Sequence, residues 1–218
     1  MDTTAPAAAP AISPSLFLFA IFYGGMVCIA GVLGNKQVAL GPLAVEAGIF
    51  AFLLLVVTSS SIAELHGRNT ANRLVLWGFI PLLVSLGLTI LVLAVPPAAD
   101  MDPARLSAFE TMMNGTPRIW LGGIVAYGIS TLLNVTIFTR LKGSEGSRLL
   151  WLRSAVASSL SQIVDTLIFI SIAFYGVFPI GELLLGQMLA KVVLSIVLVP
   201  PLIYSFVSLG RRLDRTPA

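Results

Sequence analysis

Charged residues are scarce in this sequence: they make up 11% of its 218 residues, whereas 57% are hydrophobic. Ordinary globular domains carry charges at roughly a quarter of their positions. A soluble domain of this length would need more charged side chains to cover its surface. The shortage therefore excludes an ordinary soluble domain and favours a lipid bilayer as the natural solvent.

Cysteine and histidine occur once each, as Cys28 and His66. Cys28 lies inside an apolar run, which excludes a disulfide framework and a cysteine-rich metal site. His66 lies beside Arg68 between two apolar runs, so we interpret it as a solvated loop residue and not as a metal ligand. We expect neither a bound metal nor a cofactor.

The sequence patterns of several enzyme and channel classes are also missing. No G-x-x-x-x-G-K-[ST] phosphate loop occurs, so this chain is not expected to hydrolyse ATP itself. Neither H-E-x-x-H nor G-x-S-x-G is present, and the T-V-G-Y-G filter and the arginine spacing of voltage sensors are absent. These absences predict a protein that is not an enzyme.

Long apolar runs are what the sequence has in abundance. Crossing the hydrocarbon core takes about 20 residues of helix, and runs of about that length occur at 15–34, 43–62, 74–96, 118–138, 155–178 and 182–208. Strands of a β-barrel would be shorter and would alternate in polarity. We therefore expect an all-α membrane protein with six transmembrane helices in one bundle over residues 15–208.

Lysine and arginine are distributed unevenly between the two sides of these runs. Nine lie in the segments 66–73 and 139–154 and at the C-terminal end, whereas three lie on the opposite side. Because positively charged loops stay in the cytoplasm, we expect a disordered cytoplasmic segment at 1–14 and a cytoplasmic tail at 209–218. Topology also explains the net charge of +3, so no nucleic acid partner is expected.

Asp165 stands in the middle of the fifth run, where an unpaired charge costs several kcal/mol. Ser158, Gln162, Asp165 and Phe169 follow the spacing i, i+4, i+7, i+11 and share one helical face. A polar stripe that only joins helices is the alternative, but an acid is a poor choice for that purpose. We therefore predict that this face lines a binding site.

Lys191 lies too deep in the sixth run for its ammonium to reach the interface comfortably. A buried ammonium needs a carboxylate, and Asp165 and Glu46 are the candidates. The alternative for this residue is a purely structural ion pair.

Tyr127 and Asn134 repeat the same helical spacing on the fourth run, together with Thr131. Each residue alone is explained by hydrogen bonding between helices, but two consecutive runs with such a stripe favour a shared polar cavity. Asn35 and Glu64 add polar groups where the first and second runs end.

An ordered set of residues then resembles a known family. The set comprises Trp151-Leu152-Arg153, Ala157-Ser158, Gln162, Asp165-Thr166 and Ile172-Ala173-Phe174, with Ala126-Tyr127, Asn134-Val135, Phe138, Arg140-Leu141, Asn35, Gly67, Ala71, Arg73, Lys191, Pro200 and Tyr204. Spread over residues 16–208, it resembles the signature of the queuosine precursor transporters. These form part of the vitamin uptake transporter group of bacterial inner-membrane proteins.

The resemblance implies a transporter that imports 7-cyano-7-deazaguanine, a related 7-deazaguanine or queuine. It also implies a fold similar to the six-helix substrate-binding subunits of energy-coupling-factor vitamin transporters. A guanine-like base presents two adjacent N–H groups that one carboxylate can accept, and a carbonyl that needs a donor. The expected substrate-binding residues are Asp165, Gln162, Asn134, Lys191, Tyr127, Ser158, Asn35, Glu64 and Phe169.

Two positions depart from the family pattern, since Ser60 and Asn134 stand where the family usually has aspartate. The expected partners are the small-molecule substrate and membrane lipid, and a homodimer remains open. Two alternatives also remain: a binding subunit that needs a separate ATPase module, and a structural membrane protein that transports nothing.

Overall fold

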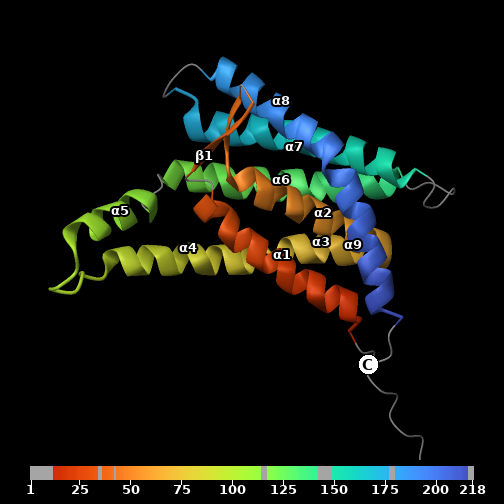
Figure 1. The fold of residues 1–218 in the computed structure, drawn as a ribbon, viewed down its shortest axis with the longest axis horizontal. Helices are drawn as coiled ribbons and strands as arrows, with labels where there is room; N and C mark the ends of the chain where they lie inside the picture. Colours follow the sequence, from red (N-terminus) through yellow and green to blue (C-terminus); the bar gives the residue numbers. More distant parts are fainter. Residues whose placement is uncertain are drawn as a thin grey trace, which may run out of the picture.

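The computed structural model describes residues 12–33, 36–41, 43–113, 117–141, 149–176 and 180–215 (Figure 1). This part of the chain is almost entirely helical. Its elements are α1 (Pro14–Leu33), β1 (Gln37–Leu40), β2 (Leu43–Glu46), α2 (Gly48–His66), α3 (Arg68–Trp77), α4 (Phe79–Ala94), α5 (Pro103–Met113), α6 (Pro117–Arg140), α7 (Leu150–Phe174), α8 (Gly181–Val197) and α9 (Val199–Leu213).

Five helical stretches are long and apolar enough to cross a membrane, and the bent pair α8–α9 provides a sixth if it counts as one span. One of the five, Arg68–Ala94, consists of α3 and α4 together. A helix pairs its own backbone N–H and C=O groups, which lipid cannot do for it. The prediction of an all-α membrane protein is therefore confirmed.

Helix α2 lies at the centre of the bundle, in contact with α1, α3, α6 and α9 (Figure 1). Helices α6, α7 and α8 pack in that order on one side of it, while α4 runs beside α1 on the other side (Figure 1). The side chains of α2 from Leu55 to Ala63 are all buried, including four hydroxyl residues from Thr58 to Ser61. A run of buried hydroxyls in the central helix shows that the interior of the bundle is partly polar.

The two ends of the bundle are distinguished by what closes them. Where α1 begins and α9 ends, the backbone N–H of Ser15 donates to Asp214 Oδ1 at 3.0 Å and its hydroxyl donates to Oδ2 at 2.8 Å. We call this end the terminal side. The opposite end carries the hairpin β1–β2, in which Gln37 is paired with Glu46 and Leu40 with Leu43, and we call it the hairpin side.

The hairpin corrects the expected start of the second span, because residues 43–46 form a strand and α2 begins only at Gly48. The chain turns at Gly41, whose φ of +60° is readily adopted by glycine. Val45 is buried, and β2 contacts α8. Its burial against the bundle explains why an apolar stretch here does not have to be helical.

His66 corrects a second expectation. It is the last residue of α2 and half-buried, and its Nε2 lies 2.7 Å from Ser15 Oγ. It is therefore a member of a cluster that joins α1, α2 and the end of α9, and not a solvated loop residue.

Two further differences concern the third and sixth runs. The helix of the third run begins at Arg68 and is interrupted at Gly78, and residues 103–113 after it form α5, which Asp102 caps through the N–H groups of Ala104 and Arg105. The sixth run is divided into α8 and α9, which meet at 42°. Pro200 and Pro201 have no N–H to donate into the preceding turn, which explains the bend.

Candidate functional site

Asp165 forms a buried ion pair with Lys191. Lys191 Nζ on α8 lies 2.8 Å from Asp165 Oδ2 on α7, and the two side chains are only 12% and 7% exposed. Ser130 on α6 donates its hydroxyl hydrogen to the other carboxylate oxygen, Oδ1, at 3.0 Å. The carboxylate thus joins three helices, and each of its oxygens has a partner.

The ion pair borders a group of aromatic rings. Lys191 Nζ lies 5.7 Å from the centre of the Phe52 ring. Phe52 meets Tyr127 edge-on at 6.2 Å between ring centres, and Phe79 also meets Tyr127 edge-on, at 5.3 Å. The Tyr127 hydroxyl donates to the hydroxyl of Tyr23 on α1. A charged pair beside flat apolar rings can bind a planar molecule with polar edges.

Glycines let the helices approach closely enough to build this arrangement. A Cβ at Gly78 would lie 2.7 Å from Tyr23 Cε1 and 3.2 Å from the Tyr127 hydroxyl oxygen. A Cβ at Gly128 would lie 2.7 Å from Phe79 Cζ. Both positions therefore need a residue without a side chain while the aromatic rings keep their present places.

A layer of buried polar side chains lies between the ion pair and the terminal side. It consists of Ser60, Ser61, Thr131, Asn134 and Gln162, and we call it the polar layer. Asn134 Nδ2 donates to Ser60 Oγ at 2.9 Å, so the two positions at which the chain departs from the family pattern contact each other.

Several atoms of the polar layer lack partners. Among the residues that the structure describes, no hydrogen-bond partner is found for Asn134 Oδ1, for either amide atom of Gln162, or for the hydroxyls of Ser61 and Thr131. Leaving a buried polar atom unpaired costs about 1–3 kcal/mol. Such a layer is suited to water or a ligand that completes its hydrogen bonds.

Glu64 is separated from this cluster. Its Oε2 lies 2.9 Å from Arg153 Nη2 near the terminal side, and both side chains are 4% exposed. Arg153 also donates from Nε to the Phe138 carbonyl at 3.3 Å, and its guanidinium carbon lies 4.4 Å from the centre of the Phe138 ring. The loop charge that the sequence suggested at Arg153 is therefore a buried member of a second ion pair.

The remaining predicted residues have different surroundings. Ser158 donates to the Ser154 carbonyl at 2.6 Å and lies 3.4 Å from the Ser195 carbonyl, so it serves the contact between α7 and α8. Phe169 is half-buried near the hairpin side of α7, where its carbonyl lies against Gly122. Asn35 lies outside the described residues, and the structure does not place it.

Ser130, Phe52 and Arg153 are functional candidates that were not among the substrate-binding residues expected from the sequence. Ser130 was not among the residues chosen for the stripe on the fourth run, although it lies four residues before Asn134 and so on the same helical face. Phe52 is one of many aromatic residues in apolar runs. Only their positions opposite charged partners on other helices distinguish them.

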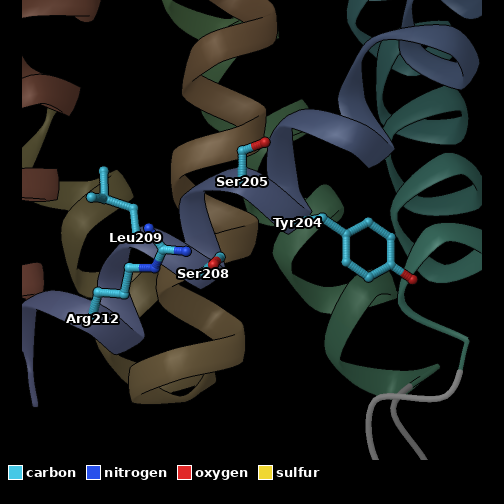
Figure 2. A pocket seen from close by; sticks show the side chains of 5 residues that line it. All are labelled: Tyr204, Ser205, Ser208, Leu209 and Arg212. Carbon is cyan, nitrogen blue, oxygen red and sulfur yellow. The ribbon is translucent and has the colours of Figure 1, made fainter.

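An open surface groove lies elsewhere on the molecule. Figure 2 shows the five side chains that line it, Tyr204, Ser205, Ser208, Leu209 and Arg212, all from α9. None of the residues around Asp165 contributes to it. A groove built on a single helix offers few convergent groups, whereas binding sites usually enclose the ligand. We therefore regard the buried cluster as the candidate site.

Within the described ranges, no group of three histidine, cysteine or acidic residues is placed to hold a metal ion.

Comparison with known proteins identifies the family of the chain. The model of a family described as "Putative vitamin uptake transporter" matches residues 46–205, a range that includes both ion pairs and the polar layer. A curated relative from Bacillus subtilis (strain 168), named "Probable queuosine precursor transporter", is 28% identical over 184 residues, covering 83% of this chain and 80% of that protein. No solved structure matches significantly. The family resemblance seen in the residues is thereby confirmed, and this multi-pass membrane protein belongs to the vitamin uptake transporter family.

Proposed function

We propose that the chain imports a queuosine precursor, such as 7-cyano-7-deazaguanine or a related 7-deazaguanine base, across the bacterial inner membrane. The observation that carries this proposal is the buried Asp165–Lys191 pair beside the Phe52 and Tyr127 rings. The name of the relative from Bacillus subtilis supports the substrate class. The sequence distribution of Lys and Arg supports cytoplasmic termini, so the substrate enters from the hairpin side.

A ligand can bind at the ion pair by replacing Lys191 as the hydrogen-bond partner of Asp165. The N1–H and exocyclic amine of a deazaguanine donate to the two oxygens of Asp165 and take the place of Lys191 on that carboxylate. Lys191 then donates to the carbonyl of the base, and the neutral ligand leaves the charge of the site balanced. The flat ring system packs against Phe52 and Tyr127.

Other groups complete the recognition. Ser130 holds one oxygen of Asp165 in place, and Gln162 and Asn134 offer amide groups with unused hydrogen-bonding capacity. A site that hydrogen-bonds each polar group of its ligand rejects analogues that lack one of them. We therefore expect guanine-like bases to bind more tightly than adenine, whose edge presents a different order of donors and acceptors.

Uptake by Asp165→Asn tests the assignment. A bacterial strain unable to make or import queuosine precursors would receive this chain or the variant, and queuosine in its tRNA would be measured after supply of 7-cyano-7-deazaguanine. We expect rescue by the unaltered chain and loss of rescue by Asp165→Asn at equal membrane abundance. Ser205→Ala, on α9 away from the cluster, is the matched control. Full rescue by Asp165→Asn would remove Asp165 from the proposed site.

Purified chain in proteoliposomes tests whether it transports unaided. Uptake of the base by this chain alone supports a complete transporter, whereas uptake only after addition of an ATPase module would make it a binding subunit. Absence of a thermal shift with any purine-like base would favour a structural membrane protein. The homodimer left open by the sequence is tested in the same preparation by cross-linking and mass measurement.

A further inference from the structure

One face of α6 connects the two buried ion pairs. Ser130, Asn134 and Phe138 follow one another at intervals of four residues and therefore lie one above the next on that face. Ser130 bonds to Asp165, and Asn134 bonds to Ser60. Arg153 donates a hydrogen bond to the Phe138 carbonyl, and its guanidinium lies over the Phe138 ring. The contacts of this face thus form a row from the proposed binding site to the Glu64–Arg153 pair, and we call this row the polar path.

Helices α2 and α7 also contribute residues to the polar path. Ser60 and Glu64 are spaced i, i+4 on α2, and they contact Asn134 and Arg153 respectively. Asp165 and Arg153 are twelve residues apart on α7, a rise of about 18 Å along a helix. The polar layer, with its unpaired amide and hydroxyl atoms, occupies the interval between the two pairs.

The two ends of the polar path carry the same kinds of side-chain group: a carboxylate, a cation and an aromatic ring. At one end, a carboxylate (Asp165) pairs with a cation (Lys191) that lies near the ring of Phe52. At the other end, a carboxylate (Glu64) pairs with a cation (Arg153) that lies over the ring of Phe138. A ligand that exchanges with the first pair presents the groups needed to exchange with the second.

We propose that Glu64, Arg153 and Phe138 form a second binding station for the same class of planar base, on the release side of the membrane, and that their ion pair is the gate that closes it. The proposal rests on the proposed function. In the closed gate the Arg153 guanidinium pairs with the Glu64 carboxylate. This pair blocks the polar path between the polar layer and the terminal side. A base that arrives there donates its two N–H groups to Glu64, and its carbonyl accepts from Arg153, whose Nη1 has no partner among the described residues. This exchange separates α2 from α7 and opens the terminal side.

Access to Ser61 from the terminal side tests the gate without any ligand. Ser61 is fully buried in the polar layer, and Ser61→Cys with Cys28→Ala makes its thiol the single one in the chain. A thiol reagent would be added to inverted membrane vesicles, and the rate of labelling measured. Adding Glu64→Gln removes the charge that holds Arg153, so we expect labelling to accelerate by on the order of tenfold or more.

Two controls separate a gate from general loosening of the fold. Arg215→Ala removes an exposed charge at the terminal side and is expected to leave the labelling rate unchanged. The double variant Glu64→Arg with Arg153→Glu restores a pair of opposite charges and is expected to slow labelling again. If Glu64→Gln does not fold, Glu64→Asp, which withdraws the carboxylate by one methylene, takes its place with the same expectation.

Addition of 7-cyano-7-deazaguanine then tests the station as a ligand site. In the unaltered background the base should accelerate labelling of Ser61→Cys, and in Glu64→Gln it should bind at Asp165, seen as a thermal shift, without sustained uptake. Labelling that Glu64→Gln does not accelerate would overturn the gate. A gate that opens in the variant but never responds to the base would overturn the second station, and failure of the base to bind even the unaltered chain would instead count against the proposed function.

Discussion

Lys191 Nζ and Asp165 Oδ2 lie 2.8 Å apart on two neighbouring helices, α8 and α7, that are held together nowhere else by an ion pair in the described part of the chain. Because the pair lies within the bundle, each charge is the main compensation for the other. Removing one partner therefore does more harm than removing both, since an uncompensated buried charge costs about 3–5 kcal/mol.

A double-mutant cycle tests this dependence. We expect Asp165→Asn and Lys191→Gln to lower the free energy of unfolding in detergent by several kcal/mol each, and the double variant to recover most of that loss. Uptake should be absent in all three, because the proposed ligand needs both charges. Stability losses that simply add in the double variant would show that the two side chains do not depend on each other.

Gly78 and Gly123 make a matched pair for testing the close approach of the helices. Ala at Gly78 would place Cβ 2.7 Å from Tyr23 Cε1, whereas Cβ at Gly123 meets nothing within 4 Å. We expect Gly78→Ala to destabilise the protein by about 1–3 kcal/mol and Gly123→Ala to be neutral or slightly stabilising, since alanine favours helix. Thermal unfolding in detergent measures both. Equal effects at the two positions would mean that the Tyr23 ring moves aside freely.

The hydroxyls of Tyr23 and Tyr127 bond to each other inside the bundle. Tyr127→Phe should cost about 1–2 kcal/mol of unfolding free energy, because it leaves the buried Tyr23 hydroxyl without this partner. The double variant Tyr23→Phe with Tyr127→Phe should be no worse than the single one, since both polar groups then disappear. A double variant that loses twice as much would indicate that each hydroxyl has another important partner.

Asp214 holds the first turn of α1 from the far end of the chain. It accepts from the N–H and the hydroxyl of Ser15, and its Oδ2 lies 3.9 Å from His66 Nε2. A carboxylate at a helix N-terminus stabilises by about 1 kcal/mol through unpaired N–H groups and the helix dipole. We expect Asp214→Ala to lower the thermal unfolding temperature, whereas Arg215→Ala, one residue later, should leave it unchanged.

Only part of the fold follows from the amino-acid sequence. The apolar runs identified the membrane class because lipid cannot satisfy backbone hydrogen bonds, and run length alone therefore implies helices. Run length could not locate the breaks at Gly78 and Leu198 or the hairpin at 37–46. These features depend on which side chains meet across helices. Because apolar residues occur alike in a strand, a bent helix and a straight helix, the length of an apolar run does not distinguish the three.

Within the site, helical spacing placed Ser158 and Asp165 on one face, yet their surroundings differ. Ser158 bonds to backbone carbonyls, whereas Asp165 bonds to Lys191 and Ser130. The sequence alone determined that a carboxylate and an ammonium would be buried in a bilayer and would need compensation. Only the tertiary structure decided that Asp165 compensates Lys191 and that Glu64 belongs to Arg153, because both pairs join residues from different helices, whose distances depend on how the bundle packs.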